Sequence, residues 1–146
     1  MSAGDFDLDR FVEAQDPIYK RVVAELRRGR KESHWMWFIF PQVSGLGLSV
    51  TAARYAIASI EEASAYLDHP VLGARLRECT DIVNAIADRS ADAIFGYPDT
   101  LKFRTSMTLF AEAATDESRF REAIVKFFGG GFDDKTLLLL GRGKTS

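Results

Sequence analysis

The sequence predicts an all-α protein, a compact single-domain bundle of about six to eight short helices. Apolar residues recur at spacings of three and four along most of the chain, as they do on one face of an amphipathic helix. Typical capping residues precede several of these runs, and glycines follow them. Only residues 35–40 are apolar and aromatic enough for a buried strand. Because no second strand is available to pair with them, we expect a buried helical turn or an irregular segment there.

The first helices are expected on either side of an Asp-Pro pair. Residues 8–12 carry a short apolar face. Asp16 can accept hydrogen bonds from free backbone amides, and Pro17 has no amide to leave unpaired, so a helix should begin here. Gly29 is suited to end that helix, because glycine adopts the left-handed conformation of a helix end without strain.

The central helices have the strongest signals. Ser59 and Glu62 form an S-x-x-E capping box, which predicts a helix from Ser59 to about Asp68. Pro70 should begin the next helix, in which the apolar positions step by four, three, four and three: Leu72, Leu76, Cys79, Val83 and Ile86. We therefore expect this stripe to face the core.

The last third should be helical as well. We predict one turn over 90–95, a helix from Pro98 and a helix over 120–128. Gly129–Gly131 interrupts the chain before a final helix, which Asp133 or Asp134 can cap. Three glycines would also suit a ligand-binding loop, but a helix end followed by a turn is their commoner role.

Length and charge limit the classes of partner. The 146 residues carry no repeat or linker, so we expect one domain, 1–146, with a flexible tail at 141–146. A net charge of −2 gives no electrostatic argument for nucleic acid or an anionic membrane. The first residues do not resemble a signal peptide, and no apolar run approaches the roughly 20 residues that span a bilayer, so a cytoplasmic protein is expected. The oligomeric state leaves no trace in the sequence.

Cofactor and metal motifs are missing from the sequence. It contains no complete glycine-rich fingerprint for a dinucleotide or for a nucleotide phosphate. His34, His69 and Cys79 are the only soft metal ligands, and His34 is not at ligand spacing from either of the others. We therefore expect no cofactor and no metal. Cys79 lies on the apolar stripe of its helix and should be a buried, unreactive thiol.

The first candidate site is the aromatic segment. Trp35 and Trp37 offer flat faces on which a planar ligand can stack, and His34 can exchange a proton near neutral pH. Gln42 can bond to the edge of such a ligand. The alternative is an aromatic core with a histidine at its rim, which is the more common use of an aromatic run.

The second candidate site is the start of the helix after Pro98. Lys102 and Ser106 are four residues apart and can share a helix face. With the hydroxyl of Thr105 they could hold a phosphate or carboxylate near the helix start, where the helix dipole also favours an anion. Asp99 could act as an acid or base. The alternative is that Asp99 caps the helix and that the hydroxyl groups are incidental.

Four blocks of the sequence resemble one known family. They are GRKESHWMWFIFPQVSGLG, YLDHPVLGARLREC, IFGYPDTLKFRTSMTLF and FFGGGFDDKTLLLL. The family is a bacterial domain of unknown function, number 1810 in the usual series, whose members are often mislabelled calpastatin. The resemblance implies a compact, mostly helical single domain and no established activity. One departure is Thr105–Ser106, where the family has two serines before MTLF.

Two functions from different classes are consistent with these residues. The first is a small-ligand domain, or an enzyme, for a planar anionic metabolite such as a nucleotide or ADP-ribose derivative. His34, Trp37, Gln42, Lys102 and Ser106 should then line one cavity. The second is a non-catalytic interaction module that uses an exposed aromatic patch. A concave wall at the tryptophans favours the first function, and a flat exposed patch favours the second.

Overall fold

The computed structural model describes residues 6–46 and 49–142, and this part of the chain is all-α. Its helices are α1 (Asp9–Gln15), α2 (Tyr19–Arg27), α3 (Met36–Ile39), α4 (Val50–Arg54), α5 (Ile60–Asp68), α6 (Leu72–Ala85), α7 (Ala91–Phe95), α8 (Asp99–Ala113), α9 (Arg119–Phe128) and α10 (Asp134–Leu139). The only β-type pairing among the described residues is an isolated bridge between Val43 and Ile57. The predicted fold class is confirmed. The predicted number of helices is too low, because segments expected as single turns, such as α3 and α7, close as short helices.

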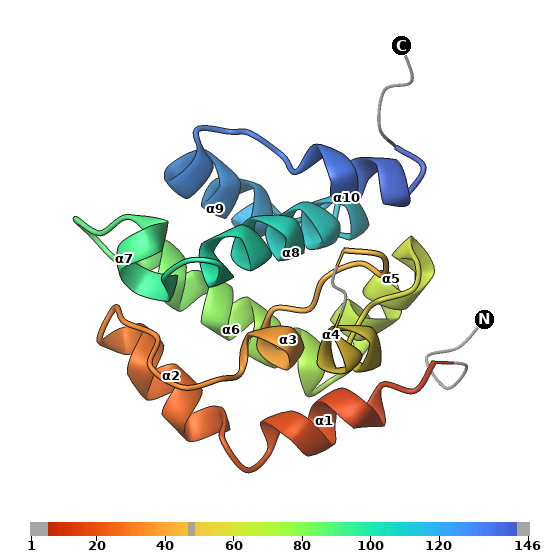
Figure 1. The fold of residues 1–146 in the computed structure, drawn as a ribbon, viewed down its shortest axis with the longest axis horizontal. Helices are drawn as coiled ribbons and strands as arrows, with labels where there is room; N and C mark the ends of the chain where they lie inside the picture. The colour runs from red at the N-terminus through yellow and green to blue at the C-terminus, as the bar shows by residue number, and fades with distance from the viewer. Residues whose placement is uncertain (1–5, 47–48, 143–146) are drawn as a thin grey trace.

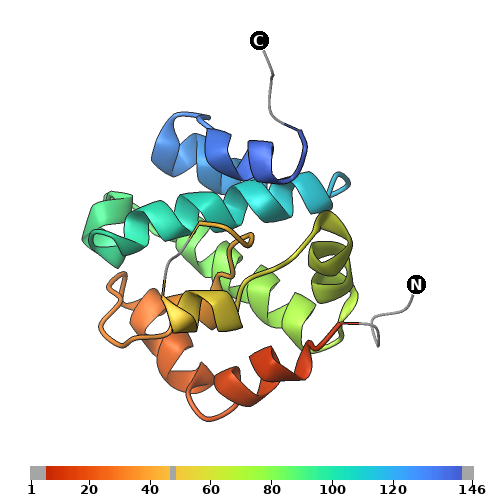
Figure 2. The same ribbon diagram turned by 45° about the vertical axis from the view of Figure 1, so that its right-hand side comes forward.

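The two longest helices, α6 and α8, organise the molecule. Helix α6 packs against α2, α5 and α9, and α8 packs against α3, α5, α7, α9 and α10. Figures 1 and 2 show α6 in the middle of the molecule. Helices α1 and α2 lie on one side of it, and helices α8, α9 and α10 lie on the other side. None of the described helices is long and apolar enough to cross a membrane.

The amphipathic stripe of α6 faces inward as predicted. Leu76 is 1% exposed and Val83 is fully buried, and Leu72 and Cys79 lie in the same stripe. Burial raises the pKa of the Cys79 thiol to about 12, so this cysteine stays protonated at neutral pH. The prediction of an inert thiol agrees with this environment.

Aromatic side chains fill the space between α3, α7 and α8. The rings of Phe95 and Phe103 stack with centroids 4.5 Å apart. The ring of Phe40 meets Phe103 edge-on at 5.1 Å, which is a favoured geometry for aromatic pairs. All three residues belong to the buried core, and they fix the end of α3 against α8.

Most predicted helix ends are correct. The Ser59 hydroxyl accepts from the amide of Glu62 at 3.1 Å, and the Glu62 carboxylate accepts from the amide of Ala58 at 2.8 Å. Asp133 accepts from the amide of Thr136 at 2.9 Å. Gly129 ends α9 in the left-handed conformation, so the glycine run has its commoner structural role.

The predicted start of the second helix is wrong. Asp16 ends α1 instead of beginning α2, and α2 begins at Tyr19. The Asp16 carboxylate lies 2.9 Å from the guanidinium of Arg75 on α6, so it pairs across the fold instead of accepting from local amides. Helix α6 begins two residues after Pro70, and the imidazole of His69 accepts from the first amides there.

The C-terminal tail is described only in part. Leu140 follows α10, and Gly141 and Arg142 are the last residues described. The expectation of a flexible tail at 141–146 therefore lies mostly outside the described residues.

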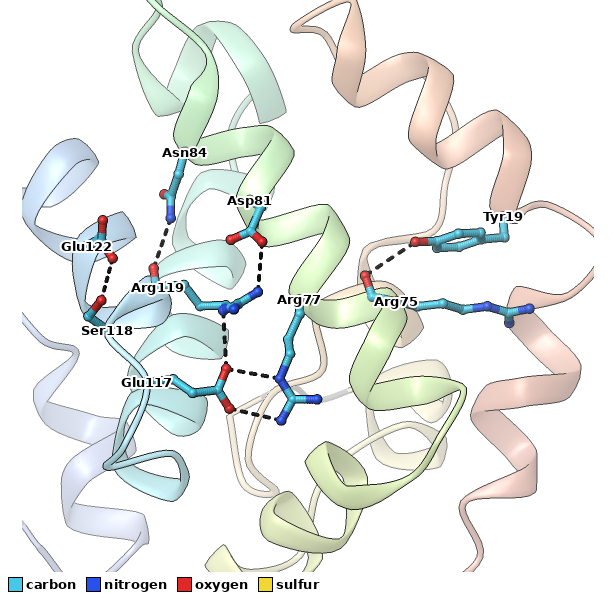
Figure 3. Close-up of polar contacts among 9 residues, drawn as sticks. All are labelled: Tyr19, Arg75, Arg77, Asp81, Asn84, Glu117, Ser118, Arg119 and Glu122. Atoms are coloured by element: carbon cyan, nitrogen blue, oxygen red, sulfur yellow. Dashed lines mark hydrogen bonds and ion pairs between the residues drawn. The ribbon is translucent and has the colours of Figure 1, made fainter.

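Ion pairs fasten α9 and the loop before it onto α6 (Figure 3). Arg77 donates two hydrogen bonds to the carboxylate of Glu117, at 3.0 and 2.9 Å. Arg119 pairs with Asp81 at 2.8 Å and approaches Glu117 at 3.2 Å. The hydrogen bonds from Arg77 hold the pKa of Glu117 below its ordinary value, so the carboxylate is charged at neutral pH.

Removing this carboxylate should destabilise the fold. We expect Glu117→Gln to lower the free energy of unfolding by roughly 1.5–3 kcal/mol, because a bidentate bond to a partly buried arginine is lost. The matched control is Glu32→Gln, which breaks the exposed pair with Arg28. That change should cost less than about 1 kcal/mol. Urea denaturation measures the free energy of unfolding of both variants. Equal losses would show that the partly buried network stabilises the fold no more than an exposed ion pair does.

Candidate functional site

A buried carboxylate shapes the loop that leads into the aromatic segment. Glu25 on α2 is 2% exposed. It accepts from the amides of Glu32 and Ser33 at 2.8 and 2.9 Å, from the Ser33 hydroxyl at 2.5 Å, and from the indole of Trp35 at 2.9 Å. These four bonds fold residues 30–35 back onto α2 and fix where α3 starts.

Sequence reasoning missed Glu25, although a signal was present. The inward face of α2 reads Val22, Glu25 and Leu26 at helical spacing, and an acid at such a position needs partners. The partners come from a loop that follows the helix, which local periodicity does not reveal.

The charge of Glu25 should make stability depend on pH. Burial alone would raise the pKa of Glu25, but the bonds from Ser33, Glu32 and Trp35 outweigh burial and lower it to about 2 from an ordinary 4.5. The stabilisation is therefore complete above pH 4.5 and is lost as the pH falls through 2. We expect this group to contribute on the order of 3 kcal/mol to the acid loss, and Glu25→Gln to lack it. Urea denaturation at several pH values tests this, and parallel pH profiles for the two proteins would contradict it.

The two tryptophans have different environments. Trp35 is completely buried, with its ring against Phe40 and its indole N–H on Glu25. It has no face free for a ligand, and it belongs to the core instead of the predicted stacking surface. Trp37 is half-buried, and the ammonium of Lys102 lies 4.6 Å from its ring centroid. The segment therefore combines the two alternatives: Trp35 is core, and Trp37 is a candidate stacking surface.

Two lysines share the carboxylate of Asp99. The ammonium of Lys31 lies 2.8 Å from one oxygen, and that of Lys102 lies 3.5 Å from the other. Two positive charges on one negative charge leave an excess of one positive charge next to the ring of Trp37. Asp99 is a first-turn residue of α8 and forms no side-chain cap, so its side chain is used to hold the lysines.

Gln42 joins the two candidate segments directly. Its side-chain amide donates to the Thr105 hydroxyl at 2.6 Å, and that hydroxyl donates to the carbonyl of Lys102 at 2.9 Å. Within the described residues, no donor reaches the Gln42 side-chain oxygen. That oxygen is therefore free to accept a hydrogen bond from a ligand.

A cavity of about 150 Å³ opens beside Trp37 and Gln42. Its other lining residues come from the loop after α3 and from α4 and its C-terminal end: Val43, Ser44, Gly45, Ala52, Ala53, Tyr55 and Ala56. Tyr55 was missed by sequence reasoning, since a single tyrosine after a short helix gives no signal. Its ring packs against Phe38 with centroids 5.3 Å apart, which fixes that wall of the cavity.

Of the five residues expected to line one cavity, three do not line this one. Lys102 lies over Trp37 but outside the cavity. Ser106 is fully buried, and its hydroxyl finds no hydrogen-bond partner in the described part of the chain. His34 is exposed and makes no side-chain hydrogen bond to any described residue. The geometry thus brings together Trp37 and Gln42 with Lys102, while Ser106 belongs to the interior of the bundle.

Metal ligation has no support among residues 6–46 and 49–142. No three side chains of His, Cys, Asp or Glu gather closely enough there to hold an ion. The polar groups around Trp37 are an amide, a hydroxyl, two ammonium groups and one carboxylate. Such a set suits an anion with a planar part better than a cation.

An all-helical domain with a small aromatic cavity is the class that fold and site define. The chain belongs to the family described as "Protein of unknown function (DUF1810)", whose model matches residues 5–140. The conserved hypothetical protein Rv1873 from Mycobacterium tuberculosis, solved by crystallography, is 55% identical to it with a TM-score of 0.93. The match covers 94% of this chain and 98% of that chain. No curated protein matches significantly. The family expected from the sequence blocks is confirmed, and the names of these matches state no activity.

Proposed function

We propose that this protein binds a small planar anionic molecule, such as a nucleotide or ADP-ribose derivative, at the cavity beside Trp37. The observation that carries the proposal is the placement of the Lys102 ammonium against the Trp37 ring, next to a cavity that Trp37 and Gln42 line. A planar group in the cavity would meet Trp37 and Tyr55, and Gln42 would bond to its edge.

The size of the cavity restricts how such a ligand can bind. Drug-sized ligands occupy roughly 300–1,000 Å³, and this cavity has about 150 Å³. It is large enough for one ring system. The charged part of the ligand would lie outside, where Lys102 can reach it across the face of Trp37. Lys31 is paired with Asp99 and would support the local positive charge.

Catalysis would require acid–base groups near the same place. His34 and Asp99 are the candidates, because an imidazole can accept or donate a proton and because Asp99 already lies beside Lys102. His34 is solvent-exposed, so a bound ligand would have to extend to it.

The competing proposal was an interaction module with an exposed aromatic patch. It needs both tryptophans on a flat surface, whereas Trp35 is buried and Trp37 lies in a concave wall. This arrangement supports the ligand proposal.

A thermal-shift screen tests the proposal. ADP-ribose and AMP should raise the melting temperature, while adenosine and pyrophosphate, which each supply half of the recognition, should act more weakly. At a concentration 100 times Kd, the stabilisation is about 2.7 kcal/mol, or roughly 5–10 °C for a domain of this size. No shift with any nucleotide or nucleotide sugar would contradict the proposal.

Lys102→Ala should separate binding from stability. We expect ligand binding to be lost, because the anion contact is removed. We expect the free energy of unfolding to change by less than about 1 kcal/mol, because the pair with Asp99 is long and partly solvated. Lys20→Ala, which removes an exposed lysine on α2, is the control and should change neither. Titration calorimetry and urea denaturation measure the two effects.

A further inference from the structure

The outward face of α2 and of the turn after it carries positive charge only. Its exposed side chains between residues 19 and 30 are Lys20, Arg21, Ala24, Arg27, Arg28 and Arg30. The one acid of this helix, Glu25, is buried and points away from this face. In a chain with a net charge of −2, the positive charge is therefore concentrated locally.

A hollow of about 440 Å³ lies where the C-terminal ends of α2 and α6 meet. Its lining includes the aliphatic side chains of Leu26, Ile82 and Ile86, which are buried or half-buried. The exposed arginines Arg27 and Arg89 lie at its rim, together with Arg28. Figures 1 and 3 show α2 along the side of α6 that lies opposite α9, and the hollow shares no residue with the network of Figure 3 that joins α6 to α9.

The two rim arginines, Arg27 and Arg89, come from different parts of the chain. Arg89 follows α6, and its side chain lies across Gly29 so closely that a Cβ atom there would be 3.0 Å from Arg89 Cδ. Within residues 6–46 and 49–142, Arg27 and Arg89 form no ion pair, while Arg28 pairs with Glu32 at 2.8 Å. Two cations without an ion-pair partner among these residues therefore line the hollow together with its aliphatic side chains.

Cations near a helix C-terminus have a structural explanation of their own. They interact favourably with the helix dipole, by about 0.3–1 kcal/mol each. This accounts for Arg27 in the last turn of α2. It does not account for a rim that two segments build together around aliphatic side chains.

We propose that this hollow docks an acidic segment of a partner protein. An aliphatic side chain of the partner enters the hollow, and carboxylates on either side of it pair with Arg27 and Arg89. Arginine suits this role because its planar guanidinium binds a carboxylate through two hydrogen bonds. A single-stranded nucleic acid would need aromatic faces for its bases, and the lining of the hollow contains none. The hollow shares no residue with the cavity at Trp37.

The test uses the full chain and a fluorescent peptide of about twelve residues. In this peptide, leucines recur at spacings of three and four, as on one helix face, and glutamates occupy the positions between them. We expect saturable binding by fluorescence anisotropy that weakens as salt is added. Arg89→Glu should weaken it at least about tenfold. Lys135→Glu, the same charge change on an exposed residue of α10, should change it less than about twofold. Replacing the leucines of the peptide by serine should also cost about tenfold or more.

Three results would overturn the proposal. The first is an absence of saturable binding of the Glu–Leu peptide to the wild-type chain. The second is equal affinity in wild type and Arg89→Glu, with both proteins folded by circular dichroism. The third is tighter binding of a single-stranded oligonucleotide that Arg89→Glu abolishes, which would assign the surface to nucleic acid.

Discussion

Glu25→Ala should be among the most destabilising single substitutions in this protein, with an expected loss on the order of 3–5 kcal/mol. The substitution removes an acceptor of four hydrogen bonds, and one of the donors is the indole N–H of the buried Trp35. A buried donor left without a partner costs about 1–3 kcal/mol by itself. The space vacated by the side chain adds a further cost, because α2 and the loop cannot fully close it.

Two controls isolate the role of this carboxylate. Glu25→Gln keeps the shape and one acceptor oxygen, and should lie between Glu25→Ala and wild type. Glu13→Ala removes an exposed acid on α1 and should change stability by less than about 0.5 kcal/mol. Urea denaturation gives all three values. A loss below about 1 kcal/mol for Glu25→Ala would mean that the loop over residues 30–35 is held in place by other contacts.

Leu76→Ala should have an effect of similar size. Leu76 is 1% exposed on the inward stripe of α6, which packs against α2, α5 and α9. Truncation removes apolar contacts and leaves a cavity, and we expect a loss of about 2–5 kcal/mol. Leu138→Ala is the matched control, because Leu138 is 53% exposed on α10. It should cost less than about 0.5 kcal/mol, and comparable losses at the two positions would contradict the packing described for α6.

The helix of Leu76 shows what sequence can predict. Its stripe is a repeat of apolar residues along one segment, and the Ser59 and Asp133 caps are local patterns of a few residues. The role of Asp16 was predicted wrongly because it does not follow from local sequence. Its local pattern favours an N-cap, and a partner far away in the sequence, Arg75, decides its actual role.

The sequence predicted the candidate site only in part. The geometry explains why some predicted residues meet at the site and others do not. Trp37, Gln42, Lys102 and Thr105 do meet across about sixty residues of sequence. Trp35 lies two positions before Trp37, and residues at that spacing do not share a helix face, so only Trp37 reaches the cavity. The spacing of residues along a helix does not reveal which faces of that helix are covered by other helices.

Ser106 illustrates this limit. It lies four residues after Lys102, as a shared face requires, but α8 is covered by several other helices, and residues 105–111 are all buried. The Ser106 side chain therefore lies inside the core, whereas the Lys102 side chain, one helical turn earlier, does not. The missing information was burial by helices that lie elsewhere in the chain, both before and after α8.

Titration of Trp37 fluorescence with ADP-ribose tests the proposed binding site most directly. Trp35 is buried, so a ligand in the cavity should alter the emission of Trp37. We expect a saturable change in the wild-type protein and none in Lys102→Ala, in which binding is lost. We also expect none in Trp37→Phe, which keeps an aromatic ring but leaves only the buried indole. Adenosine should bind at least about tenfold more weakly, because it lacks the anion. A saturable change of equal size in Trp37→Phe, or none in wild type with ADP-ribose or AMP, would contradict a ligand site at Trp37.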